Sequence, residues 1–386
     1  MSEVVELTRE LVSIPSHEDE TAAGDRIEQW LRAETDAEVT RDEAGNVLAR
    51  RGPDESESSG DTTSLALVGH HDVVPPDDSQ TSAEGDSVAS ETQRNGGGEA
   101  AGEYIVEERD GRLYGRGTAD MKGAVAASML AFRDATPEEL DCELVFASFV
   151  GEEVGGDGAR AAIEDGFAPD YAIVGEGSTG YSAPGVTDVA VAHKGRRGST
   201  VTARGSAAHA SEPAKGENAV YRACDAVDVI RELDFPAVEV LGEEVSGSVA
   251  VTGIDGGSAW NVIPEGCEIT VDERTVPGER APLERVEEIA GVEWTVDQDL
   301  PPMQCDDEAF AETVLAAAVD AQSVSSEPEL VSKPHATDAG WLAEAGTTCV
   351  VCGVAEPGEA HTKTESASVE VLERCYEIYR GAAERL

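Results

Sequence analysis

Two histidines and an aspartate stand together in the stretch LALVGHHDVVPP, at residues 65–76. The apolar run before them is typical of a buried strand, and the polar residues follow where the run ends. Histidine nitrogen and carboxylate oxygen are zinc ligands, and a ligand histidine usually donates its second ring N–H to a carboxylate. The pattern therefore predicts His70 as a metal ligand and Asp72 as the residue that orients it.

More acidic residues and another histidine stand in comparable places along the chain. They are Asp120 in a Gly-rich turn before a helix, Glu152 and Glu153 after residues 143–151, Glu176 after residues 171–174, and His361 in the loop after residues 347–354. Ligands of open α/β sheets bind beyond the carboxyl ends of the strands. The set fits a two-metal site, in which one carboxylate bridges ions ~3.5–4 Å apart and a further acid serves as base.

The elements that must position these residues alternate along the chain. Apolar spacing predicts helices over 3–14, 21–34 and 121–135, and short apolar runs predict buried strands over 64–69, 143–151, 171–177 and 347–354. Strands that alternate with helices indicate an α/β sheet with parallel character.

A second domain is expected within the first. A chain of 386 residues favours two domains. From 186 to 296 strand-like stretches are followed by helical ones twice, which predicts a smaller α+β domain inserted between residues 1–185 and 297–386.

Three segments have a plainer interpretation. Residues 52–64 and 77–103 are rich in Gly, Ser, Asp and Glu, and we expect solvated surface loops there; the second could border the site. Cys349 and Cys352 form a CxxC inside an apolar strand-like run. Core packing is the favoured interpretation, with a redox or zinc role as the alternative.

The charge of the chain is extreme. There are 28 Lys and Arg against 79 Asp and Glu, a formal net charge of −51, which excludes binding to nucleic acid or to an anionic membrane. Because molar salt screens such self-repulsion, we expect a cytoplasmic protein of a salt-adapted organism. The N-terminal stretch is acidic and amphipathic rather than a signal peptide, the cysteines are expected to be reduced, and no apolar run could span a membrane.

Seven motifs, in order, resemble those of the M20 metallopeptidase and amidohydrolase family. They are GHHDVVP (GHxDxVP), GRGTADMKG (GRGxxDMKG), GEEVGGDGA (EExGxxG), GEGS after a strand, GSAAHASEPAKGENAV (GxxxHxSxPxxGxNA), WNVIPEGCEITVDERTVP (NxIPxxxxxxxDxR) and AHTKTE (AHxxxE). The resemblance covers nearly the whole chain. It implies a zinc-exopeptidase-like mixed sheet flanked by helices, with residues 186–296 as a lid and dimerisation domain of a homodimer.

The resemblance also implies a role for each site residue. His70 and Glu176 would hold one metal ion, Glu153 and His361 the other, and Asp120 would bridge them. Glu152 would be the general base, Asp72 would orient His70, and the lid residue His209 would reach the substrate carbonyl. Zinc is the default metal, with cobalt or manganese as alternatives. His71 matches no family role, and we expect it to be a packed residue.

The implied reaction is hydrolysis of an amide bond in a small N-acyl amino acid. The metals would make a water more acidic, Glu152 would accept its proton, and His209 would stabilise the oxyanion. Asn261 and Arg274 match lid residues that hold the substrate carboxylate, and Arg197 could add a charge or a structural anchor. Arg274 could instead brace its own domain.

The substrate is predicted less sharply. The stretch HATDAGWL (335–342) departs from the desuccinylase pattern TSDxRF, because Gly340 stands where that pattern has arginine. A deacylase similar to acetylornithine deacetylase is therefore expected. The alternatives are a dipeptidase or carboxypeptidase, a hydrolase that releases lysine or ornithine from a carrier protein, a two-metal phosphoesterase, and a non-catalytic binding relative.

Overall fold

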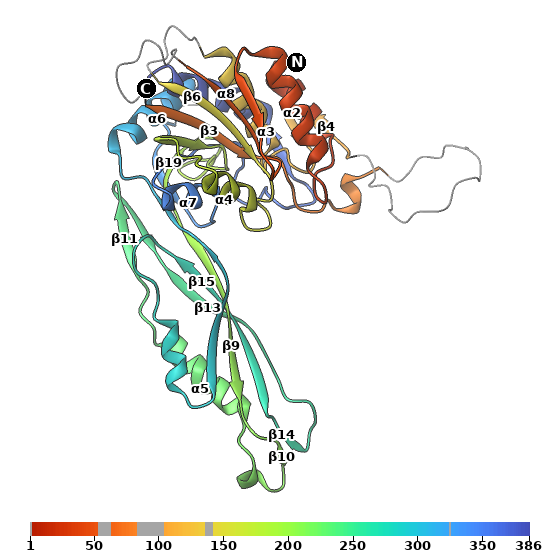
Figure 1. Ribbon diagram of the computed structural model, residues 1–386, viewed down its shortest axis with the longest axis vertical. Helices are drawn as coiled ribbons and strands as arrows, with labels where there is room; N and C mark the ends of the chain where they lie inside the picture. Colours follow the sequence, from red (N-terminus) through yellow and green to blue (C-terminus); the bar gives the residue numbers. More distant parts are fainter. Residues whose placement is uncertain (1, 53–62, 83–103, 136–141, 324–325) are drawn as a thin grey trace, which may run out of the picture. The chain divides into compact units, whose positions relative to one another are not determined.

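The computed structural model describes residues 2–52, 63–82, 104–135, 142–323 and 326–386 (Figure 1). The chain forms two compact units. The first comprises residues 1–191, 305–331 and 341–386, and the second comprises residues 192–304 and 332–340. The inserted domain was expected over 186–296. Most of the segments 52–64 and 77–103 lies outside the described residues.

A mixed sheet forms the framework of the first unit, and its last strand, β17, consists of residues of the second unit. Its order among the described residues is β1-β2-β6-β3-β7-β19-β8-β17, and β18 pairs with β8 outside this order. The strands are β1 (Glu38–Arg41), β2 (Val47–Arg51), β3 (Ser64–His70), β6 (Glu143–Phe149), β7 (Tyr171–Val174), β8 (Val189–His193), β17 (Met303–Gln304), β18 (Leu330–Lys333) and β19 (Thr348–Val351). A three-stranded sheet joins β20 (Ser366–Ser368), β5 (Arg112–Tyr114) and β4 (Glu107–Arg109).

The four strands expected from the apolar runs lie side by side in parallel. β3 pairs with β6 on one edge and β7 on the other, and β19 pairs with β7. Six of the seven residues of β3 are buried, as are six of the seven of β6. Continuous apolar runs of this kind are typical of strands covered on both faces. Their carboxyl ends consequently meet at one edge of the sheet.

Helices flank this sheet. They are α1 (Glu3–Val12), α2 (Thr21–Glu34), α3 (Lys122–Asp134), α4 (Asp157–Glu164), α6 (Glu308–Ala321), α7 (Asp338–Glu344) and α8 (Val369–Ala383). α3 packs on β3 and β6 and against α1 and α8, and its residues 122–132 are all buried. A helix that is apolar all round belongs inside a protein, as α3 does. Figure 1 shows α4 and α7 across the sheet from α3 and α8.

The second unit is built on an antiparallel sheet with the order β13-β15-β9-β16. Its elements are β9 (Gly195–Arg204), β10 (Ala208–His209), α5 (Ala219–Arg231), β11 (Ala237–Val240), β12 (Glu243–Ser246), β13 (Ser248–Gly256), β14 (Val262–Ile263), β15 (Gly266–Thr275) and β16 (Val292–Leu300), with short 3₁₀ turns at η3 (Pro213–Lys215) and η4 (Leu283–Glu288). β10 pairs with β14, and β11 pairs with β12.

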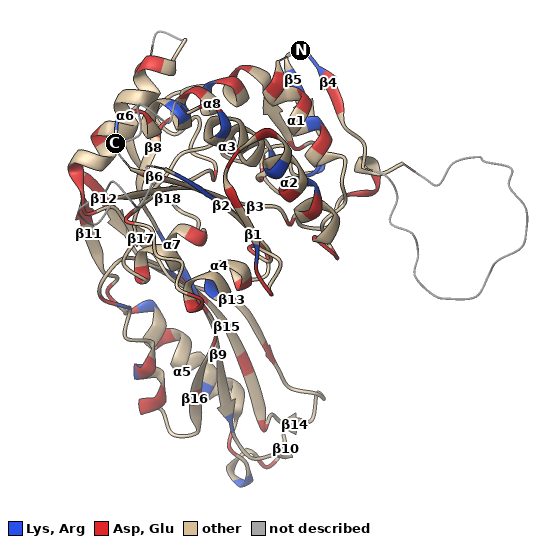
Figure 2. Ribbon diagram, turned by 45° about the horizontal axis from the view of Figure 1, so that its top comes forward, with Lys and Arg blue, Asp and Glu red and all other residues tan. Residues whose placement is uncertain are grey.

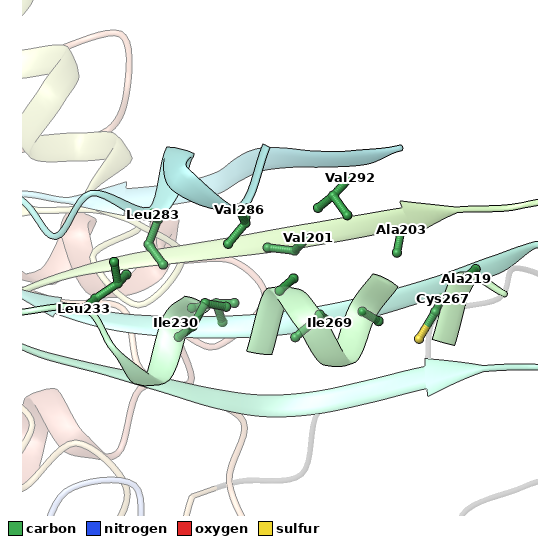
Figure 3. Close-up of a cluster of buried hydrophobic side chains, with 13 residues drawn as sticks. Val201, Ala203, Ala219, Ile230, Leu233, Cys267, Ile269, Leu283, Val286 and Val292 are labelled. Carbon is green, nitrogen blue, oxygen red and sulfur yellow. The ribbon is translucent and has the colours of Figure 1, made fainter. Parts of the chain in front are cut away.

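A small apolar core holds the second unit together (Figure 3). The α5 residues that face the sheet are Ala219, Ala223, Ala226 and Ile230, spaced as one stripe of a helix. They pack on alternate residues of β9 and β15, where buried and more exposed side chains alternate along each strand. The second helical stretch expected in the inserted domain, residues 283–292, forms only the 3₁₀ turn η4, which ends at Glu288 because the backbone of Ile289 is extended.

Acidic side chains are distributed along the elements of both units, and basic ones are few (Figure 2). Within the described residues no helix is long and apolar enough to cross a membrane. All seven cysteines are free, and burial raises the pKa of the Cys349 and Cys352 thiols, so core packing describes this CxxC.

Candidate active site

The candidate ligands gather where the parallel strands end. His70 is the last residue of β3, Glu152 and Glu153 lie in the turn after β6, and Glu176 comes two residues after β7. Asp120 precedes α3, which packs on β3. Neighbouring parallel strands thus deliver these side chains to one edge of the sheet, as the sequence predicts.

Asp120 lies between the two candidate ligand histidines. Its Oδ1 is 3.3 Å from Nε2 of His70, and its Oδ2 is 3.1 Å from Nε2 of His361. The Oε1 of Glu176 lies 3.3 Å from His70 Nε2, and Oε2 of Glu153 lies 3.1 Å from His361 Nε2. One carboxylate therefore faces two histidine–glutamate pairs, which is the arrangement expected of a bridging ligand.

Asp72 stands behind His70. Its Oδ1 is 3.2 Å from Nδ1 of that ring, and its two oxygens also accept the backbone N–H groups of Glu152 (3.2 Å) and Glu153 (3.0 Å). Burial favours the neutral acid, but the hydrogen bonds from His70 and the two amides prevail and lower the pKa of Asp72. Asp72 thus holds the ring of His70, a candidate ligand, and anchors the turn that carries two more candidate site residues.

The carboxylates around His361 favour a positive charge at this position. Hydrogen bonds to Asp120 and Glu153 raise the pKa of this imidazole to about 10, because the surrounding carboxylates stabilise a positive charge there. The backbone of His361 has φ 62°, an uncommon conformation for a non-glycine residue that is often found at functional sites.

The donor set fits a divalent cation. Among the described residues, two groups have ligand atoms within 4.8 Å of one another: His70 with Glu152 and Glu176, and His70 with Asp120 and Glu153. Several carboxylates this close together repel one another unless a cation balances them. Imidazole nitrogen with carboxylate oxygen is a zinc donor set that also suits neighbouring transition metals.

Glu365 is a site residue that sequence reasoning did not assign. Its Oε1 accepts the backbone N–H groups of Gly117 (2.9 Å), Ala119 (3.1 Å) and Asp120 (3.1 Å), and its Oε2 lies 2.5 Å from Nη1 of Arg116. Burial raises the pKa of Glu365 to about 7, although Arg116 and the amides favour the charged form. The acid at the end of AHTKTE was the available signal, because it follows the candidate ligand His361 by four residues.

Two smaller features shape the same edge. A Cβ on Gly175, the residue before Glu176, would lie 2.9 Å from Cε of Met121 and 3.0 Å from Cβ of Ala124, so glycine permits the close approach of β7 to α3. His71 contacts β6: its Nδ1 lies 2.9 Å from Oγ of Ser148, and burial lowers its pKa to about 3. It is a packed neutral residue, as expected.

The remaining candidates belong to the second unit. His209 ends β10 and Asn261 directly precedes β14, the strand that pairs with β10, and the Asn261 carbonyl accepts the N–H of Ala210 (2.8 Å). Arg197 is buried, with Nε 2.5 Å from Glu273 and Nη2 3.0 Å from the carbonyl of Ala281. Such contacts suit a structural anchor.

Arg274 also has a partner in its own unit, because its Nε lies 2.8 Å from Oδ1 of Asp272. About a third of its side chain is exposed. The substrate-binding roles of Arg197, Arg274 and Asn261 stay predictions.

The chain is similar to known proteins over most of its length. The model of Peptidase family M20/M25/M40 matches residues 66–385. An acetylornithine deacetylase of Myxococcus xanthus is 31% identical over 368 residues, which cover 88% of this chain and 85% of that protein.

Solved structures share the fold at lower identity. The aminopeptidase PepT of Bacillus cereus has a TM-score of 0.78 at 19% identity, covering 99% of this chain and 98% of its own. The YXEP protein of Bacillus subtilis, a dinuclear metal binding peptidase from the M20 family, has a TM-score of 0.68 at 16% identity, covering 99% and 96%. The expected mixed sheet flanked by helices is confirmed.

Proposed function

The chain belongs to peptidase family M20/M25/M40 and is a hydrolase of amide or peptide bonds, and we propose that its substrates are small N-acyl amino acids. The observation that carries this proposal is the similarity, over most of both chains, to an enzyme whose name states deacetylation of acetylornithine. The likenesses to peptidases of known structure concern the fold.

The surroundings of Gly340 support a deacylase without the desuccinylase arginine. A Cβ at this position would lie 2.2 Å from the carbonyl oxygen of Pro301 and 3.3 Å from Cε1 of His193. The backbone of Pro301 therefore fills the place where a side chain would begin. An arginine would have to displace that backbone, so an anionic acyl group would lack this partner.

We assign the metal ligands as the resemblance implies: His70 and Glu176 for one ion, Glu153 and His361 for the other, and Asp120 between them. Zinc is the expected ion, with cobalt or manganese as alternatives. When bound, the ions would polarise the substrate carbonyl and lower the pKa of a water.

Glu152 is the proposed general base. It lies in the turn that Asp72 anchors, and its Oε2 is 4.0 Å from Nε2 of His70, farther than the carboxylates of Asp120 and Glu176. In this role it accepts the proton of the attacking water and delivers it to the leaving amine nitrogen. His209 donates a hydrogen bond to the carbonyl oxygen as negative charge develops there.

A hydrolysis panel tests the proposal. Protein loaded with Zn²⁺ or Co²⁺ in about 2 M KCl, where exposed charges are screened, is given N-acetylornithine, N-succinyl-diaminopimelate, other N-acetyl amino acids and dipeptides. We expect turnover of an N-acetyl amino acid and little of the succinyl compound, with Glu152→Gln as the control for contaminating activity.

The alternatives predict other results of the same panel. Preferential cleavage of dipeptides would replace the proposal with a dipeptidase or carboxypeptidase. A folded, metal-loaded protein that cleaves none of the compounds would overturn it in favour of a carrier-protein substrate.

We further propose a cytoplasmic homodimer formed through the second unit. Within the described residues, β13 pairs only with β15, so its other edge offers unpaired backbone groups to a second copy. Light scattering after size exclusion in high salt tests this: a monomer mass would exclude the dimer. Free thiols and the net charge of −51 support a reducing and salty compartment.

A further inference from the structure

His209 is held by its own turn. The backbone N–H of Glu212 donates to the His209 carbonyl (2.8 Å), which closes a tight turn over residues 209–212. Inside this turn the ring nitrogen Nδ1 of His209 accepts the backbone N–H of Ser211 at 3.1 Å and lies 2.6 Å from the Oγ of Ser211. Both contacts of Nδ1 therefore come from one residue.

These contacts decide where the imidazole carries its proton. A backbone N–H can only donate, so the Nδ1 that accepts it must bear a lone pair. The hydroxyl of Ser211 then also donates to Nδ1. In a neutral imidazole the single proton is consequently on Nε2.

We propose that Ser211 is a positioning residue: its hydroxyl, together with its own backbone N–H, fixes His209 as the Nε2–H tautomer, so that the ring presents a hydrogen-bond donor to the substrate. A donor is what a carbonyl oxygen requires as it becomes an oxyanion, whereas the opposite tautomer would present a lone pair and repel it. The catalytic consequence rests on the proposed function; the tautomer itself does not.

Ser211 is the residue whose hydrogen bonds fix the position of the ring proton of His209. The imidazole is exposed, and within the described part of the chain no carboxylate forms an ion pair with it. The histidines of the metal site differ, because their rings face Asp72, Asp120 and Glu153. The tautomer of His209 is therefore set by the local turn rather than by a neighbouring acid.

Nitrogen NMR tests the tautomer directly. The full-length protein is labelled with ¹⁵N-histidine, and ring signals are recorded at a pH of about 8.5, where an ordinary histidine is neutral. His209→Gln identifies the His209 signals among the seven histidines. We expect a protonated Nε2 and an acceptor Nδ1 in the wild type. Ser211→Ala keeps the backbone N–H but removes the hydroxyl, and should bring the two ¹⁵N shifts closer together because one of the two donors to Nδ1 is lost.

Kinetics tests the consequence. With N-acetylornithine, Ser211→Ala should lower kcat by about 3–10-fold, the effect of one hydrogen bond, with little change in KM. Ser211→Thr keeps the hydroxyl and should restore kcat. In a His209→Ala background, Ser211→Ala should have no further effect. The matched control is Ser206→Ala, at an exposed serine of the same unit that forms its hydrogen bonds with Glu217 through the backbone.

The outcomes separate this inference from the function. An Nδ1–H tautomer in the wild type, or identical ring shifts in wild type and Ser211→Ala, would overturn the positioning role whatever the enzyme cleaves. The expected shifts with no turnover of N-acetylornithine would support the role of Ser211 and count against the proposed substrate.

Discussion

Glu365 holds the backbone of Asp120: its Oε1 accepts the Asp120 N–H at 3.1 Å, and the same oxygen accepts two earlier amides of that loop. The loop carrying Asp120, the proposed bridging carboxylate, is therefore fixed by a residue 245 positions later in the chain. This contact joins the two parts of the first unit that flank the inserted residues.

Replacing Glu365 should destabilise the protein strongly. Glu365→Ala would leave Arg116, whose side chain is 4% exposed, without its carboxylate, and would leave three amides without their acceptor. Breaking a buried pair in this way costs about 3–5 kcal/mol of the free energy of unfolding.

Urea unfolding measures this change. Glu356→Gln is the matched control, because it breaks a partly exposed pair with Arg112 and should cost no more than about 1 kcal/mol. Equal effects of the two variants would contradict the role assigned to Glu365.

Asp72→Asn should weaken metal binding. The side chain of asparagine has one acceptor oxygen where the carboxylate has two. It therefore cannot accept both backbone N–H groups, those of Glu152 and Glu153, as Asp72 does. Loss of a residue that orients a ligand typically costs 10–100-fold in metal affinity, and about that loss is expected here.

Competitive titration with a chromophoric chelator measures this affinity. Asp77→Asn, which changes an acid that caps the turn η1 (Asp78–Gln80), should leave it unchanged. Unaltered affinity in Asp72→Asn would remove Asp72 from the metal site.

Glu152→Gln and Glu153→Gln should differ although the residues are neighbours. Loss of a general base lowers kcat by roughly 10²–10⁴-fold while the metal ions stay bound. Loss of a ligand removes metal. Metal content by mass spectrometry and kcat on the same samples separate the two cases. Metal loss in Glu152→Gln would make Glu152 a ligand, as its membership of a group with His70 and Glu176 also permits.

His71 should make the stability depend on pH. Burial lowers its folded-state pKa to about 3, against 6.5 in the unfolded chain, so the unfolded state binds the extra proton between these values. Its contribution to the free energy of unfolding is complete above pH 6.5 and decreases by about 1.4 kcal/mol per pH unit below it. At pH 5 the loss is about 2 kcal/mol.

Urea unfolding at pH 7.5 and pH 5 checks this. His71→Gln does not titrate, so its free energy of unfolding should decrease less over this range by that amount. His17→Gln is the control for a half-buried histidine near the surface. Parallel decreases in wild type and His71→Gln would show that His71 is not held neutral.

Salt should stabilise the chain. The net charge of −51 repels itself in the folded state, and KCl at molar concentration shortens the screening length to ~3 Å. We expect Tm to rise by at least about 5 °C between low and molar KCl, the shift that ~4 kcal/mol produces in a chain of this size. Circular dichroism melts measure it, and a flat or falling Tm would contradict the expectation of a salt-adapted protein.

The ends of the parallel strands could be predicted from sequence because their signals are local. The run before His70 and the run before Glu152 are continuous and apolar, and parallel strands of this kind end at a common edge. The pairing of Asp72 with His70 could also be predicted, since the chemistry of a ligand histidine calls for an acid nearby.

Other features depend on contacts that distant segments make only after folding. The role of Glu365 requires the loop at 117–120 to wrap around one of its oxygens. The spacing of residues along the chain does not indicate this contact. The strand β8 was assigned to the inserted domain by its position after residue 186, yet it pairs with β19 of the large sheet. Arg197, a candidate for substrate binding, forms an ion pair with Glu273, the residue opposite it where β9 pairs with β15.

The order in which the chain leaves the ribosome has a consequence for the metal site. His70, Asp120, Glu153 and Glu176 are all synthesised before the residues of the second unit, whereas His361 and the Glu365 that fixes the Asp120 loop come after them. A nascent chain therefore carries an incomplete acidic cluster while the second unit is synthesised, and the candidate metal site is complete only when the last segment of the chain arrives.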